Sequence, residues 1–339
     1  MTGRESSTAG DSAQSGTVRV LGYDVRRVVS SEAEERTALG SAAGVLHAPW
    51  ERLLEVRGPD AASFLHVLLT QHIRGLSVGD RVRAALANRK GHLEADLVVH
   101  RAGEDRFLLR VPSIAAERVW MVLETHRILE DVSFHWPYDD PDAFLVLGPD
   151  ARRIVSAATH HDGGADGPCG DEPRTADPGA DGPRGDEPIG NATPMPVDEV
   201  GPDDVLLVFE RDGREAVLDR LREAGAAAIG WDTFDRLRIE RGRAWFGIDA
   251  DEERLVPEPG YGDRIHYDKG CYLGQEPLAR LHFRGKPNWE LVRLHSSSDD
   301  APPKGTALVD ADGERVGWLT SAAASAWLRG AWVLAPEVP

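Results

Sequence analysis

A cysteine lies between two glycines in the segment DKGCYLGQE, residues 268–276. Glycine lets the backbone turn tightly or approach a ligand closely. Cys271 follows Lys269 and precedes a helix predicted through PLARLHF, in which Pro277 is an early residue. A lysine and a helix N-terminus both stabilise a thiolate. The pattern therefore predicts a reactive thiol, and its structural alternative is a half-buried cysteine in a loop shaped by glycines.

Arginine residues surround Glu240 in the segment RLRIERGRAWFG, residues 236–247, where two aromatic residues follow them. Arginine beside aromatic rings can hold a ring, a carboxylate or a phosphate. A second basic group follows the cysteine and comprises Arg280, His282, Arg284 and Lys286. Because the two groups flank the cysteine loop, they favour a site for an anionic ligand. Taken alone, each is better explained as a solvated helix face with internal ion pairs.

Two carboxylates occur in NRKGHLEADL, residues 88–97, after a predicted turn. In a strand, Glu94 and Asp96 share one face, because side chains alternate between faces. Paired carboxylates can perform acid–base chemistry, but on the edge of a sheet they often serve solubility alone. The local sequence leaves both interpretations open.

Strands and helices alternate along the chain in the manner of an α+β protein. Strands are predicted at 52–57, 81–87, 94–103, 105–111, 131–136, 143–148 and 204–210. Helices are predicted at 58–73, 113–129, 149–159, 214–227 and 231–242. Short alternating runs at 290–296, 305–310, 315–321 and 329–335 predict a small all-β unit, which we expect to be a barrel.

The middle of the chain is acidic and repetitive. Residues 161–204 hold twelve acidic residues and two arginines, which is more than half of the net charge of −18. ADGPCGDEP recurs there as ADGPRGDEP, with Arg184 in place of Cys169. Such a segment cannot bury enough apolar surface to offset its ordering entropy, so we expect a flexible insertion. We expect no chemical role for Cys169.

The cysteine count also limits the chemistry. Two distant cysteines cannot form a disulfide framework, a paired-cysteine zinc site or a four-thiolate cluster, and we predict no metal ligands. Cysteine usage favours the cytoplasm. No run of eighteen apolar residues occurs, and MTGRESSTAGDSAQSG lacks the apolar stretch of a signal peptide, so we expect no membrane contact.

The string KGCYLGQE, followed by LARLHFRGKPN, resembles the signature of the YgfZ-type folate-binding family. That family is related to the aminomethyltransferase (T-protein) of the glycine cleavage system. LEVRGPDAASFLHVLLT, NRKGHLEADLVV and FDRLRIERGRAWFGID resemble its other segments in the same order. The resemblance covers residues 20–150 and 205–335.

The resemblance implies an aminomethyltransferase-like, folate-binding multidomain fold around a central hole, with a small C-terminal β-barrel. The cofactor it implies is tetrahydrofolate or a derivative. The expected divisions are a disordered tail at 1–19, a folate-binding domain at 20–157 and 204–287, an acidic disordered insertion at 158–203 and the barrel at 288–339.

The resemblance also implies roles for individual residues. Cys271 matches the cysteine on which the family depends, and Glu240 matches the glutamate that holds the pterin in the related transferases. The expected catalytic residues are Cys271, Lys269 and Asp96. The expected cofactor-binding residues are Glu240, Arg243, Arg236, Tyr272, Gln275 and Glu276. The transferases carry adjacent acidic residues where this chain has Ala95 and Asp96, which disfavours their reaction here.

Three functions follow as hypotheses. The first is a folate-binding accessory factor for iron–sulfur cluster assembly or repair, whose partners are iron–sulfur proteins or their assembly machinery, and tRNA or a tRNA-modifying enzyme. The second is a folate-dependent aminomethyltransferase or demethylase that uses Asp96 on a methylamine-type substrate. The third is a binding module for tRNA or a protein, mapped to Arg280, Arg284 and Lys286. The sequence leaves open whether the chain turns over a substrate.

Overall fold

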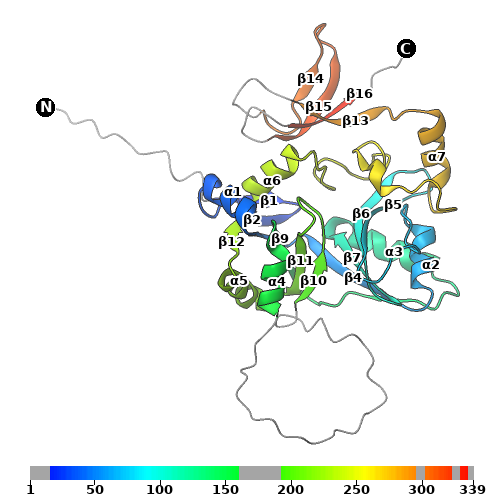
Figure 1. The fold of residues 1–339 in the computed structure, drawn as a ribbon. Helices are drawn as coiled ribbons and strands as arrows, with labels where there is room; N and C mark the ends of the chain where they lie inside the picture. Colours follow the sequence, from blue (N-terminus) through cyan, green and yellow to red (C-terminus); the bar gives the residue numbers. More distant parts are fainter. Residues whose placement is uncertain (1–15, 160–191, 295–301, 323–328, 335–339) are drawn as a thin grey trace, which may run out of the picture.

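The computed structural model describes residues 16–159, 192–294, 302–322 and 329–334. These residues form a mixed α/β fold with two five-stranded sheets, a four-stranded sheet and a small hairpin (Figure 1). The hairpin pairs β1 (Thr17–Val20) with β2 (Tyr23–Arg26). Because β1 begins at Thr17, the prediction of a disordered tail at 1–19 is wrong for residues 17–19.

The first sheet has the antiparallel strand order β5-β6-β7-β4-β8. Its strands are β4 (Glu51–Arg57), β5 (Arg81–Ala87), β6 (Leu93–Gly103), β7 (Arg106–Pro112) and β8 (Ser133–His135). Two helices share its core, namely α2 (Ala61–Leu68) and α3 (Ala116–His126). All five strands agree with the sequence patterns, whereas α2 is shorter than the predicted helix at 58–73.

The turn between β5 and β6 is rigid, and it positions the pair of acidic residues. The Asn88 side-chain oxygen accepts hydrogen bonds from the backbone N–H groups of Lys90 at 2.9 Å and His92 at 3.2 Å. Gly91 has φ 82°, which favours glycine. β6 then runs between β5 and β7, and Asp96 is 3% exposed, so the alternative that the pair serves solubility alone does not hold for Asp96.

The second sheet has the order β10-β11-β9-β3-β12. Its strands are β3 (Gly44–His47), β9 (Pro141–Leu147), β10 (Thr193–Pro196), β11 (Val205–Glu210) and β12 (Ala227–Ile229). Four helices accompany them: α1 (Glu32–Ser41), α4 (Ala151–Thr159), α5 (Arg214–Glu223) and α6 (Trp231–Glu240). One core lies beneath α4 and α5, and a second core joins this sheet to the first.

The acidic segment is partly folded. β10 and the loop after it, residues 192–203, lie within the insertion expected at 158–203, and Glu199 is 2% exposed. The expectation of disorder is therefore wrong for residues 192–203. The acidic composition was misleading here, because Arg83 of the first sheet binds Asp198 and Glu199 at 2.8 Å. Cys169 lies outside the described residues.

The C-terminal sheet has the antiparallel order β13-β16-β15-β14. It comprises β13 (Trp289–Leu294), β14 (Ala307–Val309), β15 (Arg315–Ala322) and β16 (Arg329–Leu334). The described strands form an open sheet, so the expected barrel is not confirmed. Asp249 links this sheet to α6, because it accepts hydrogen bonds from Thr320 at 2.6 Å and binds Arg238 at 2.6 Å.

Segment 246–278 packs on the core of the first sheet and ends in α7 (Gln275–Arg284). Phe246, Tyr261, Tyr272 and Leu278 all contribute to that core. The cysteine loop is therefore anchored on the first sheet rather than on the C-terminal sheet. No helix in the described ranges is long and apolar enough to cross a membrane.

Candidate functional site

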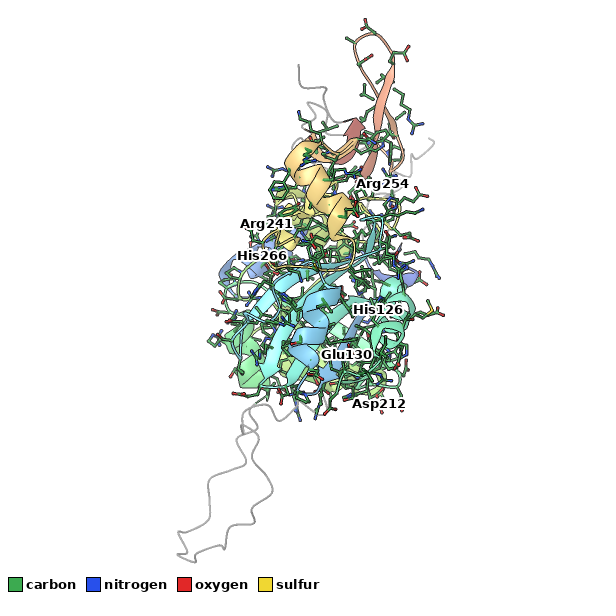
Figure 2. All side chains as sticks on the ribbon, turned by 90° about the vertical axis from the view of Figure 1, so that its right-hand side faces the viewer. His126, Glu130, Asp212, Arg241, Arg254 and His266 are labelled. Carbon is green, nitrogen blue, oxygen red and sulfur yellow. The ribbon has the colours of Figure 1, made fainter. Side chains whose placement is uncertain are left out.

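The cysteine loop precedes α7, which faces the viewer above α2 in Figure 2. Cys271 carries an exposed free thiol. Gly270 and Gly274 have φ of 93° and 81°, both in the left-handed region. A Cβ on Gly274 would lie 2.4 Å from the carbonyl oxygen of Asn88. Glycine is thus required where the loop presses against the β5–β6 turn.

Lys269 fastens this loop to the end of α2. Its amine donates hydrogen bonds to the carbonyl oxygens of His66, of Leu69 at 2.7 Å and of Gln71 at 2.9 Å. The last carbonyls of a helix lack partners within the helix, so this lysine serves as a cap. Burial, and then Arg74, lower the pKa of Lys269. Its amine is occupied by backbone oxygens, which indicates a positioning role for this expected catalytic residue.

Tyr272 lies beneath the loop, 7% exposed. Its ring centroid is 5.0 Å from the Lys269 amine. Its hydroxyl group is buried without a hydrogen-bond partner in the described part of the chain. Burial, and then Tyr267, raise the pKa of Tyr272. The motif thus turns Lys269 and Tyr272 inward and Cys271 outward.

The last two motif residues open α7. Gln275 is half-buried, and its backbone N–H donates to the Tyr272 carbonyl oxygen at 3.2 Å. The Glu276 side chain is 89% exposed and lies 3.8 Å from Arg280. Both residues were expected to bind a cofactor, and they lie on the outer side of the loop with the thiol.

Asp96 belongs to a buried ionic cluster between the two five-stranded sheets. Its two oxygens accept hydrogen bonds from Arg264 at 2.6 and 3.4 Å, and Arg83 lies 3.9 Å away. Arg83 also binds Glu199 at 2.8 Å. Asp96 is 3% exposed and fully paired, which leaves it poorly placed to exchange protons with a substrate. Glu94 is separate from this cluster and binds Arg118 at 3.0 Å.

The buried cluster predicts a loss of stability in acid. Burial would raise the pKa of Glu199, but Arg110 and Arg83 outweigh it and lower that pKa to about 2. A carboxylate with a lowered pKa in the folded state stabilises the protein above its unfolded pKa and loses this effect as the pH falls. We expect the free energy of unfolding to fall by about 3 kcal/mol between pH values of about 4.5 and 2.

Urea unfolding across this pH range measures the effect, beside Glu199→Gln. The variant removes the titrating group, so its unfolding free energy should change less with pH than that of the wild type. Equal pH slopes for the two proteins would contradict the role assigned to Glu199.

Glu240 ends α6 and faces α1. Arg36 binds both of its carboxylate oxygens, at 2.9 and 3.0 Å, and Arg236 lies 3.9 Å away. Arg236 also binds Glu32. Arg243 makes no ion pair within the described ranges, and it lines a cavity of about 80 Å³ together with Arg293. Of the three residues expected to bind the cofactor here, Arg243 lines this cavity, and Glu240 and Arg236 do not.

The expected site residues thus form three separate groups. Cys271, Lys269, Tyr272, Gln275 and Glu276 share the loop on the first sheet, Asp96 lies in the ionic cluster, and Glu240 with Arg236 lies between α6 and α1. No described contact joins Cys271 to Glu240. Within the described residues, no group of three or more His, Cys, Asp or Glu side chains is arranged to hold a metal ion.

Sequence reasoning missed the residues that neutralise the cluster, namely Arg83, Arg110, Arg264 and Glu199. One usable signal was present for Glu199, because it lies between Val197 and Val200 in a stretch that is otherwise acidic. The arginines carried no comparable signal, since charged residues within strands are usually exposed.

Comparison with known proteins defines the fold. The crystal structure of the glycine cleavage system aminomethyltransferase T from Bartonella henselae superposes with a TM-score of 0.77 and 18% sequence identity, over 95% of this chain and 87% of that one. The chain has the aminomethyltransferase fold. Residues 11–167 match the family model of the GCVT N-terminal domain.

Bacterial aminomethyltransferases are similar in sequence to most of the chain. An aminomethyltransferase of Rubrobacter xylanophilus is 28% identical over 306 residues, covering 90% of this chain and 78% of the relative. One of Corynebacterium jeikeium is 24% identical over 315 residues, covering 90% and 81%. The similarity extends beyond the GCVT N-terminal domain into the region of the cysteine loop.

Proposed function

We propose that this chain is a tetrahydrofolate-binding accessory factor for iron–sulfur cluster assembly or repair, including that of enzymes that modify tRNA. Cys271 is its reactive group. The observation that carries the proposal is the outward thiol of Cys271 on a loop whose neighbours Lys269 and Tyr272 are buried. Such a loop presents a thiol to a partner at low conformational cost.

Folate binding is supported by the aminomethyltransferase relatives, whose reaction uses tetrahydrofolate. In this proposal Glu240 holds the pterin, because a carboxylate can accept two parallel N–H groups. Arg36 already donates to both oxygens of that carboxylate, and each oxygen has a further lone pair that can accept a hydrogen bond. When bound, the folate would supply a carrier for a one-carbon unit.

The arginines of α6 and its following loop fit the anionic end of the same ligand. Arg243 and Arg293 line a cavity of about 80 Å³, well below the roughly 300–1,000 Å³ of a site that encloses a whole ligand. The cavity therefore accepts one charged end, such as the glutamyl carboxylates, and Arg236 acts indirectly by positioning Glu240. Tyr272, Gln275 and Glu276 then shape the thiol loop.

The second candidate is a folate-dependent aminomethyltransferase or demethylase, which the names of the relatives favour. It would use Asp96 on a methylamine-type substrate. The pairing of both Asp96 oxygens with Arg264, and the alanine at position 95, weigh against it. For that reason we rank it below the accessory factor.

Titration with tetrahydrofolate tests the first candidate. Glu240→Ala should weaken binding at least about tenfold, because charge-assisted hydrogen bonds are worth about 1.5–3 kcal/mol. Cys271→Ala should bind as the wild type does. Isothermal calorimetry measures both variants, beside the exposed Glu104→Ala as the matched control.

Two outcomes would contradict the proposal. If the wild-type protein showed no saturable binding of tetrahydrofolate, the folate-binding part of the proposal would be wrong. Turnover of a methylamine-bearing substrate that survives Cys271→Ala and is lost in Asp96→Asn would favour the transferase instead.

A further inference from the structure

A basic groove of about 590 Å³ lies between the β5–β6 turn and α7, and we call it the α7 groove. Its charged lining residues are Arg89, Lys90, Glu276, Arg280 and Arg284. Four cations thus face one carboxylate, on a chain whose net charge is −18. The charge of the groove is opposite in sign to that of the whole protein.

Most of these cations lack a partner. Arg280 lies 3.8 Å from Glu276, and both side chains are largely exposed. Arg89, Lys90 and Arg284 make no ion pair with the part of the chain that the structure describes, whereas arginines elsewhere are commonly paired. Clustered cations repel one another, so an uncompensated group favours a polyanionic partner.

An exposed aromatic ring lies next to the cations on α7. Phe283 follows Arg280 by three residues, which makes the two neighbours on the helix surface, and it is 67% exposed. A planar group is therefore available for stacking beside the cations.

The two walls of the groove are fixed relative to each other. A Cβ on Gly91 would meet Pro277 and Leu278 of α7 at 3.2 Å, so the turn and the helix are in close contact. The turn itself is held by the Asn88 side chain, which accepts hydrogen bonds from the backbone N–H groups of Lys90 and His92. The cations are thus presented on two rigid elements, which lowers the entropic cost of binding.

We propose that the α7 groove binds a single-stranded nucleic acid, with phosphates on its cations and an unpaired base stacked on Phe283. Basic grooves with aromatic platforms are the usual means of holding such strands. An acidic protein segment would satisfy the charges but not the exposed ring of Phe283, and in a duplex the bases are already stacked. The inference does not depend on folate binding.

Fluorescence anisotropy with a labelled twelve-nucleotide oligouridylate tests this inference. We expect log Kd to depend on log salt with a slope of magnitude about 3, since about 0.7 counterions are released for each of four phosphate contacts. Arg280→Glu with Arg284→Glu should reduce that magnitude to about 1. Phe283→Ala should weaken binding about five- to tenfold through lost stacking.

Matched controls separate the outcomes. Arg26→Glu reverses one charge on β2, on the opposite side of the molecule from α7 in Figure 1, and should leave binding nearly unchanged. The proposal would be overturned if the double charge reversal left the affinity for oligouridylate unchanged. It would also be overturned if a polyglutamate peptide bound as tightly as the oligonucleotide and Phe283→Ala left the affinity for that peptide unchanged.

Tetrahydrofolate binding by the groove variants is measured in parallel and should match that of the wild type. The two proposals can therefore fail separately.

Discussion

Replacing Arg264 with leucine is expected to lower the free energy of unfolding by about 3–5 kcal/mol. The guanidinium group binds both oxygens of the buried Asp96 and lies 3.4 Å from the ring centroid of Tyr261. Removing it leaves a buried carboxylate with Arg83 at 3.9 Å as its closest remaining cation. Urea unfolding, followed by circular dichroism, measures the change.

The double variant Arg264→Leu with Asp96→Leu provides the internal control. It removes both charges, so it should recover part of the lost stability. The exposed Arg26→Leu should change the unfolding free energy by no more than about 0.5 kcal/mol. If Arg264→Leu lowered the free energy of unfolding by less than about 1 kcal/mol, the remaining arginines of the cluster would be sufficient to stabilise Asp96, contrary to this expectation.

Replacing Lys269 with methionine is expected to lower the free energy of unfolding by about 2–3 kcal/mol, because it leaves buried carbonyl oxygens without a donor. Three carbonyls at the end of α2 accept from this amine. If Lys269 only positions the loop, the rate at which iodoacetamide alkylates Cys271 should stay near that of the wild type under folding conditions. Both measurements use a Cys169→Ala background, so that one thiol reacts.

The exposed Lys286→Met is the matched control, since it makes the same chemical change outside the loop. It should alter neither stability nor alkylation. A large fall in the alkylation rate of Lys269→Met, with stability retained, would instead assign the lysine a direct part in activating the thiol.

Local patterns predicted most secondary elements of the first sheet. The run RVRAALA became β5 over the same residues, and DRFLLRV became β7 within one residue at either end. Alternation of side chains in strands and the helical repeat are properties of neighbouring residues, so they can be read from short segments. The same reasoning missed β10, because two of its four residues are prolines, which are tolerated in a strand only at the edge of a sheet.

The cysteine motif was also visible in the sequence, but the separate roles of its members were not. Its glycines predicted a tight loop, and their positive φ angles agree with that prediction. The inward direction of Lys269 depends on the end of α2, about 200 residues earlier in the chain. No pattern in a short stretch of sequence predicts a hydrogen bond between residues so far apart in the chain.

The sequence by itself determined the order of the main elements, the glycine-flanked turn around Cys271 and the resemblance to folate-binding proteins. The tertiary structure alone decided that Asp96 is neutralised by Arg264, which lies 168 residues away, and that Arg89 and Lys90 join α7 in one basic groove. Charge pairing and clustering arise when distant segments are buried together, and burial is a property of the packed sheets rather than of any short stretch of sequence.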